Sequence, residues 1–249
     1  MTFKLGKKAA APHKFSLKFS TYVDATQLPP LPQVFGHDSL IQSWPMLGND
    51  QWGDCVWAGA AHETMLLTEE AGHVSVFTDE DVLSDYAVVT GFNPKDPNTD
   101  QGTDVHTAAQ YRQNTGIVDS VGNRHKIAAF LALRPGNVID LYLATYLFSC
   151  VGIGVQLPQS ALDQAEQNQT WDVVQGSTIV GGHYVPLVGR DSNNLLHTIS
   201  WGKKQLMTEV FLKTYCDEAW AYVSTENLVN QKSPEGFDYA QLQADLAGL

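Results

Sequence analysis

The first residue in the chain whose type and position suggest chemistry is Cys55, which the pattern places at the start of a helix. A tight Gly-Asp turn precedes it, small and apolar residues continue to 67, and Gly72 ends the run. Asp54 is predicted to be the N-cap, because its carboxylate can accept the free amides of the first turn. The helix N-terminus lowers a thiol pKa, so a thiolate nucleophile is expected near neutral pH. The alternative is a small buried cysteine of no chemical consequence.

A histidine far downstream supplies the base that a cysteine nucleophile needs. Residues 181–189 are typical of a strand with His183 at its mouth, 192–194 of a turn, and 195–202 of the return strand. Such a base usually comes from distant sequence, so a Cys–His pair is predicted. His62 is a weaker rival, because a histidine on the cysteine's own helix points along that helix and not across a cleft.

Three short motifs resemble those of the papain-like cysteine peptidase superfamily: Gly-Asp-Cys at 53–55, Gly-His-Tyr-Val at 182–185 and Ser-Trp-Gly at 200–202. Their order along the chain is that of the family. The runs around the cysteine and after Trp201 resemble, more narrowly, a group of bacterial and phage proteins of papain-like type. The resemblance covers roughly residues 40–225.

The resemblance implies an α+β, papain-like fold. An N-terminal helical subdomain would carry the cysteine helix, and a C-terminal antiparallel β subdomain would carry the histidine. The order of elements agrees with this, because helices come first and strands mostly later, as in an α+β protein with two subdomains and a cleft between them.

The resemblance also implies roles for individual residues. Cys55 would attack an amide carbonyl, and His183 would take its proton. Asn49, six residues before the cysteine where the family has glutamine, would hold the oxyanion together with the Cys55 backbone amide. Gln51 is the other candidate for that amide and is expected, with Gly182, to bind substrate.

One position departs from the family pattern. The family places an asparagine directly before Ser-Trp-Gly to orient the histidine, and this chain has Ile199 there, which cannot hydrogen-bond. Ser200, or a carboxylate such as Asp191, is the predicted substitute. Trp201 is expected to bind substrate and to shield the site from water.

Two classes of function follow. The first is a cysteine-dependent hydrolase, most simply a peptidase, although a deamidase or transferase uses the same pair. The second is a catalytically weak or inactive papain-like protein with a structural or docking role, for example in a phage virion or an assembly. Ile199 and a basic N-terminal arm motivate the second.

Composition limits the partners. The 249 residues are 43% hydrophobic, enough for a full core, and carry a net charge of −12, which argues against nucleic acid. No membrane span or signal peptide is apparent, so a soluble protein, cytoplasmic or virion-associated, is expected. The widely spaced Cys55, Cys150 and Cys216 suggest neither disulfides nor zinc, and no cofactor or metal is expected. The expected partner is a peptide or protein substrate.

Residues 1–33 differ from the rest of the chain. Five lysines, at 4, 7, 8, 14 and 18, precede the first acidic residue, and prolines gather at 29–32. This segment is predicted to be an extended basic arm, followed by the papain-like domain over 34–228 and a polar tail over 229–249. The arm is either a solvated tail with a strand at 15–19, or a docking arm that lies on an acidic neighbour, giving self-association, or on its own domain.

The remaining elements follow from caps and periodicity. The loop over 91–102 is interpreted as turns, because its carboxylate spacing does not fit a calcium loop. The predicted helices cover 79–89, 104–114, 137–148 and 208–217, the strands 127–133, 151–157 and 219–223, and a short helix or loop 161–168.

Overall fold

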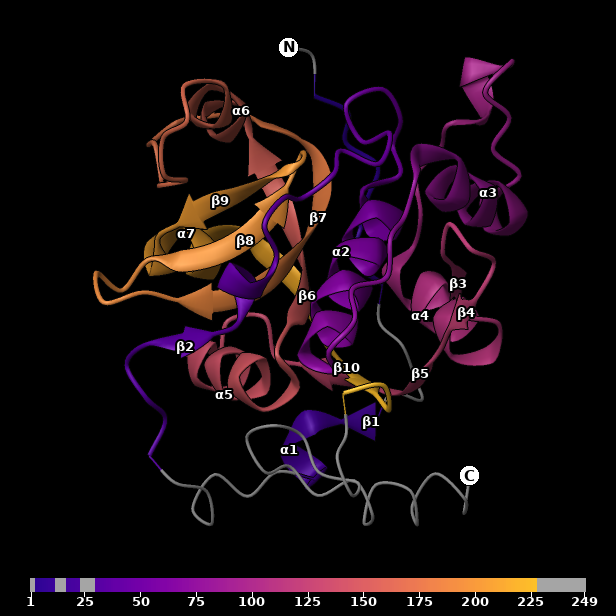
Figure 1. Cartoon of the computed structure of the whole chain (residues 1–249). Helices are drawn as coiled ribbons and strands as arrows, with labels where there is room; N and C mark the ends of the chain where they lie inside the picture. The colour runs from indigo at the N-terminus through magenta and orange to yellow at the C-terminus, as the bar shows by residue number, and fades with distance from the viewer. Residues whose placement is uncertain (1–2, 12–16, 23–29, 228–249) are drawn as a thin grey trace.

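The computed structural model describes residues 3–11, 17–22 and 30–227 (Figure 1). The helices are α1 (Phe19–Tyr22), α2 (Cys55–Glu70), α3 (Asp79–Thr90), α4 (Val105–Asn114), α5 (Val138–Phe148), α6 (Gln159–Glu166) and α7 (Glu209–Tyr215), with short 3-10 turns η1 (Asp38–Leu40) and η2 (Pro97–Thr99). The strands are β1 (Leu17–Lys18), β2 (Phe35–Gly36), β3 (Ile117–Val118), β4 (Arg124–His125), β5 (Ile127–Leu133), β6 (Val151–Pro158), β7 (Ile179–Arg190), β8 (Leu196–Ser200), β9 (Lys203–Met207) and β10 (Cys216–Ser224).

One large sheet organises the molecule. Its strand order is β1-β5-β10-β6-β7-β8-β9, and β2 pairs with β7. All of these pairings are antiparallel except that of β1 with β5. Helices α2, α3 and α4 lie together on one side, and the strands β6 to β9 with α6 and α7 lie on the other (Figure 1). The α+β prediction is confirmed, although two short strands of the sheet, β1 and β2, precede the helices α2, α3 and α4 in the chain.

Two hydrophobic clusters form the core, one on each face of the sheet. Alternation along β10 assigns its side chains to them, because successive residues of a strand point to opposite faces. Ala219, Ala221 and Val223 join the cluster shared with α5 and α7, whereas Trp220 and Tyr222 join the cluster around α2 and α4. The sheet therefore packs against both halves of the core.

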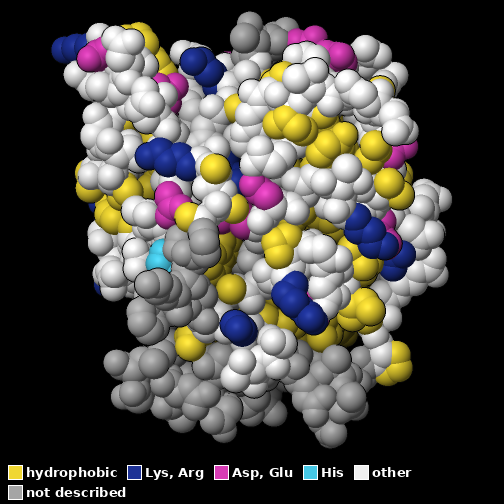
Figure 2. All heavy atoms as spheres, turned by 180° about the vertical axis from the view of Figure 1, so that it is seen from behind, with side chains coloured by type: hydrophobic (Ala, Val, Ile, Leu, Met, Phe, Trp, Pro, Cys, Tyr) yellow, Lys and Arg dark blue, Asp and Glu magenta, His cyan; other side chains and the backbone are white. Residues whose placement is uncertain are grey.

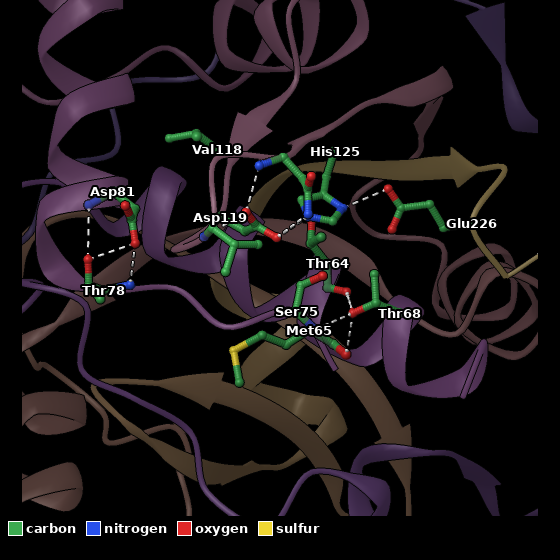
Figure 3. A network of polar contacts seen from close by, with 12 residues as sticks. Thr64, Met65, Thr68, Ser75, Thr78, Asp81, Val118, Asp119, His125 and Glu226 are labelled. Carbon is green, nitrogen blue, oxygen red and sulfur yellow. Dashed lines mark hydrogen bonds and ion pairs between the residues drawn. The ribbon is translucent and has the colours of Figure 1, made fainter. Parts of the chain in front are cut away.

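Local signals set most helix starts as predicted. The capping box that opens α3 is present, with Thr78 and Asp81 bonded reciprocally (Figure 3). Asn137 and Thr208 cap α5 and α7 through their side chains, as expected. The predicted strands at 127–133, 151–157 and 219–223 correspond to β5, β6 and β10, and the short element near 161–168 is the helix α6.

The N-terminal segment contacts the body of the protein at more than one place. Leu17 and Lys18 pair with β5, and Phe19 is buried in the core beside Phe148. Of the predicted strand at 15–19, Leu17 and Lys18 form β1 and Phe19 begins α1, while residues 15–16 lie outside the described residues. The predicted tail over 229–249 lies outside the described residues. Among the described helices, none is long and apolar enough to cross a membrane.

Candidate active site

Cys55 is the first residue of α2, as predicted, but the helix is not capped as predicted. Asp54 stands at the N-cap with φ −98° and ψ 15°, and its side chain caps no helix amide. Its Oδ1 accepts instead from Asn49 Nδ2 at 3.0 Å. The Asp54 carbonyl accepts from the amides of Trp57 and Ala58. This carboxyl is fully buried, and burial raises its pKa well above the usual value.

One face of α2 rests directly on β7. Gly59, one turn after Cys55, lies so close to Tyr184 that a Cβ there would be 2.6 Å from its ring. One turn further, Glu63 accepts the Tyr184 hydroxyl at 2.6 Å and Arg112 Nη1 at 2.6 Å. Positions i, i+4 and i+8 share a helix face. The contacts at Gly59 and Glu63 therefore hold the face that begins with Cys55 against β7.

His183 lies on β7 and is held on two sides. Its Nε2 is 2.8 Å from Ser200 Oγ, and its ring stacks on Trp201 with centroids 4.4 Å apart. Its Nδ1 has no hydrogen-bond partner among the described residues. Asp191 is placed elsewhere, because its carboxylate accepts the amides of Asn193 and Leu195. Of the predicted substitutes for the missing asparagine, Ser200 is the one in contact with the imidazole.

The start of α2 brings Cys55 next to the strand that carries His183. The backbone amide of Tyr184, the residue after His183, lies beside the Cys55 sulfur. Cys55 comes from the start of α2 and His183 from β7. No hydrogen bond joins the two side chains among the described residues, so the Cys–His pair stays a prediction. Trp201, 4% exposed, covers the histidine from the other side.

The protonation states of the pair differ from the sequence expectation. Burial raises the pKa of the Cys55 thiol to about 12, and the nearby amides of Tyr184 and Gly6 only partly oppose this. Burial lowers the pKa of His183 to about 3. Both groups are therefore neutral at pH 7, and the expectation of a thiolate near neutrality is wrong for this arrangement.

The chain's own N-terminal segment covers the thiol. Residues 3–8, here called the cover segment, run between the start of α2 and β7, where the indigo trace enters in Figure 1. Thr103 lies on one side, donating to Gly6 O at 2.7 Å and accepting from Lys8 N at 3.0 Å. On the other side, Lys7 N donates to Gly182 O at 3.1 Å. Phe3 stacks on Trp201 with centroids 4.1 Å apart.

Glycines, which have no Cβ, allow the backbone of the cover segment to approach Gly53, Thr103 and β7 closely. A Cβ at Gly6 would lie 1.7 Å from the Gly53 carbonyl oxygen, and one at Gly102 would lie 2.0 Å from Gly6 O. A Cβ at Gly182 would lie 2.4 Å from Lys7 O. The groove between Thr103 and Gly182 therefore accommodates an extended backbone, hydrogen-bonded on both edges, directly over Cys55.

The other predicted site residues are placed as follows. The Asn49 amide donates to Trp52 O at 3.3 Å and to Asp54, so both of its protons are directed into its own loop. Gln51 is exposed beside that loop. The oxyanion role of either residue stays a prediction. The rival base His62 is turned away, with Nε2 2.8 Å from Pro45 O.

Sequence reasoning missed several residues that shape the groove. Asp100, in the loop interpreted only as turns, accepts the Gly53 amide at 3.1 Å and the Tyr86 hydroxyl at 2.6 Å. Thr103 supplies one edge of the groove, and Asp217 and Glu218 lie against the cover segment. No local motif marks these positions. Among the described residues, no group of His, Cys, Asp or Glu is arranged to hold a metal.

Comparison with solved structures places this geometry among known proteins. Xylellain, a cysteine protease from Xylella fastidiosa, is similar with a TM-score of 0.68 at 12% identity, covering 90% of this chain and 97% of that one. The fold is papain-like. Procathepsin B from Trypanosoma congolense is similar with a TM-score of 0.62 at 13% identity, over 89% and 86% of the two chains.

The bromelain protease from Ananas comosus adds a third example, with a TM-score of 0.52 at 11% identity over 78% of this chain and 99% of that one. No family model and no curated protein sequence matches the chain. The papain-like fold thus rests on three-dimensional similarity at identities where the sequences themselves have diverged.

Proposed function

We propose that this protein is a cysteine peptidase whose active site is closed by its own N-terminal segment. One observation carries the proposal. Cys55 lies beside the backbone that follows His183, under an extended backbone that is hydrogen-bonded to Thr103 on one edge and Gly182 on the other. A peptide substrate presents the same kind of backbone, and edge pairing of this sort recognises main chain whatever the sequence.

The chemistry assigns a role to each nitrogen of His183. In the tautomer that this mechanism requires, Nε2–H donates to Ser200 Oγ, and Nδ1 is the base that takes the Cys55 proton. The sulfur attacks the substrate carbonyl carbon, and the backbone amide of Cys55 stabilises the oxyanion. His183 returns the proton to the departing amine, and water then cleaves the thioester to release the acid and restore the thiol.

The closed arrangement explains why the pair is neutral. The cover segment lies over Cys55 and so contributes to the burial that raises the pKa of the thiol, although the Gly6 backbone and the Lys7 charge partly oppose that shift. When the segment leaves, water reaches both groups and the charged forms become less costly. The proposal therefore requires that activity appear only after the cover segment is displaced.

The test uses the full-length chain with Gly6→Val and Lys7→Ala, here called the opened variant. A side chain at position 6 cannot fit against Gly53 O, so the segment is unseated without being removed. The opened variant is expected to cleave fluorescent casein at least tenfold faster than wild type, and the added Cys55→Ala change abolishes cleavage. An opened variant that is folded by circular dichroism and cleaves nothing contradicts the proposal.

The second candidate is a docking protein with the same fold and no catalysis, for instance in a virion or an assembly. Ile199 and the strongly raised Cys55 pKa favour it. On the face in Figure 2, Lys and Arg side chains are dispersed among acidic ones, so a protein surface is a better partner there than a nucleic-acid backbone. Absence of cleavage by the opened variant, with Cys55 unreactive at neutral pH, supports this candidate.

A deamidase or transferase uses the same Cys–His pair, so the products must be identified. Mass spectrometry of the casein digest distinguishes these reactions. New peptide termini identify a peptidase, whereas an unbroken chain with a mass change at glutamine or asparagine identifies the others.

A further inference from the structure

The side chain of Lys7 occupies an acidic pocket beside the candidate active site. Its ammonium contacts Asp217 Oδ2 and Glu218 Oε1, each at 3.0 Å, and donates to Lys8 O at 3.0 Å. An ammonium has three protons, so every one of them is used. The Lys7 side chain is 0% exposed, which makes it a fully enclosed cation bound by two carboxylates.

The pocket is built by the body of the protein and does not depend on Lys7 for its shape. Glu218 Oε2 accepts from Trp220 Nε1 at 3.2 Å, and Asp217 Oδ2 accepts from Gln156 Nε2. These bonds fix both carboxylates from strands β6 and β10. Gly154 makes room for the lysine stem, because a Cβ there would lie 2.0 Å from Lys7 Cε.

The carboxylates also face a further space. A cavity of about 350 Å³ is lined by Asp217, Glu218 and Trp220, together with Lys18 and Ala10. Asp217 and Glu218 therefore border free space next to the pocket that holds the Lys7 ammonium.

The pocket binds the side chain of the residue that directly follows the one lying over the Cys55 thiol. Gly6 is the residue whose backbone reaches the Cys55 sulfur, and Lys7 follows it directly. The Lys7 amide is bonded to Gly182 O, next to His183. A side chain in this pocket thus belongs to a residue adjacent to the one positioned at the thiol.

We propose that Asp217 and Glu218 form a specificity subsite that selects peptide substrates with a lysine or arginine next to the residue whose carbonyl is cleaved. This inference rests on the proposed peptidase function. Once the cover segment leaves, two largely buried carboxylates lose their counter-ion, and an apolar side chain would leave them unpaired. A basic side chain restores the contacts that Lys7 makes.

The test measures cleavage of internally quenched decapeptides by the opened variant. The peptides share one neutral sequence in which a single lysine is moved from position to position. The cleavage site, mapped by mass spectrometry, is expected to move with the lysine, so that the cleaved bond keeps the same spacing from it. Replacing that lysine by leucine should lower kcat/KM at least tenfold, and arginine should preserve it.

Matched variants test whether the preference for lysine comes from Asp217 and Glu218. Asp217→Asn with Glu218→Gln in the opened variant should abolish the lysine preference, while cleavage of the leucine peptide continues and so reports a folded enzyme. Asp163→Asn, which removes an exposed carboxylate on α6, should leave the preference unchanged. Cleavage of casein without any lysine dependence overturns this inference and leaves the peptidase proposal standing. Failure of the folded opened variant to cleave casein overturns both.

Discussion

The Cys55 thiol is subject to two opposing influences, and their magnitudes decide its state. The helix N-terminus favours the thiolate by about 0.3–1 kcal/mol, which is less than one pKa unit. Burial acts the other way and, even after the neighbouring amides are counted, takes the pKa from 9.0 to about 12. That change corresponds to roughly 4 kcal/mol. Burial therefore exceeds the helix dipole, and displacement of the cover segment is expected to shift the balance toward the thiolate.

Alkylation of Cys55 should report this balance. A thiol with a pKa of about 12 is thiolate in only about 1 part in 10⁴ at pH 8, whereas an ordinary cysteine is about a quarter thiolate. Wild-type Cys55 is expected to react with iodoacetamide at least about a hundredfold more slowly than Cys55 in the opened variant. Mass spectrometry of the Cys55 peptide separates it from Cys150 and Cys216.

His183→Ala in the opened variant is the control. If a thiolate–imidazolium pair forms after opening, reaction well below pH 7 disappears in this variant. Equal rates for wild type and the opened variant would show that the cover segment does not protect the thiol.

At the scale of elements, the site depends on how closely α2 approaches β7. Gly59 lets the helix touch Tyr184, and the Glu63 carboxylate links Tyr184 to Arg112 on α4. Tyr184 also bonds the Tyr222 hydroxyl of β10 at 3.1 Å. Because Cys55 begins α2 and His183 precedes Tyr184, this buried network sets the position of Cys55 relative to His183.

Gly59→Ala should disturb both stability and catalysis. A Cβ at 2.6 Å from the Tyr184 ring cannot be accommodated without moving α2 or the tyrosine. We expect a loss of about 1–3 kcal/mol in the free energy of unfolding, measured by urea denaturation, and a lower kcat in the opened background. Gly136→Ala is the matched control, since a Cβ there meets nothing within 4 Å. Equal unfolding midpoints for the two variants would contradict the close contact.

At the scale of the whole molecule, buried histidines link stability to pH. Burial lowers the pKa of His62 to about 4 and that of His183 to about 3. The unfolded chain takes up these protons near pH 6.5, whereas the folded chain does not. His125 works in the opposite sense, because its hydrogen bond with Glu226 and its contact with Asp119 raise its pKa (Figure 3).

Acid should therefore destabilise the fold. Stability from the two buried histidines is complete above pH 6.5 and is lost as the pH falls toward 4, by about 3 kcal/mol for each group. Two such losses are comparable with the total stability of an ordinary domain. The urea midpoint is expected to fall steadily from pH 7 to 4.5.

His62→Gln tests one of these groups. Glutamine can donate to Pro45 O as the histidine does but does not titrate, so the midpoint should depend less steeply on pH in this variant. An unchanged slope would show that His62 is not the neutral buried group described here. His125 has the opposite effect, because the stability that it contributes is lost as the pH rises through its raised pKa. Its contribution therefore changes on the alkaline side and can be separated from those of His62 and His183.

The sequence by itself determined the local features of this protein. Caps and periodicity gave α3, α5 and α7 their starts and placed β5, β6 and β10, because those signals act within a few residues. The order of the cysteine, the histidine and the Ser-Trp-Gly motif was enough to indicate the fold and to name Cys55, His183 and Ser200. These features depend on residue type and spacing, which the chain carries in one dimension.

Only the tertiary structure decided how the site is closed and charged. Lys7 meets Asp217 across 210 residues, and no local pattern pairs them. Asp54 looked like an ordinary cap, yet burial and Asn49 direct its carboxylate elsewhere. The neutral state of Cys55 follows from the surfaces that pack over it. Burial and long-range ion pairs are properties of packed surfaces, and neither exists until distant segments of the chain have come together.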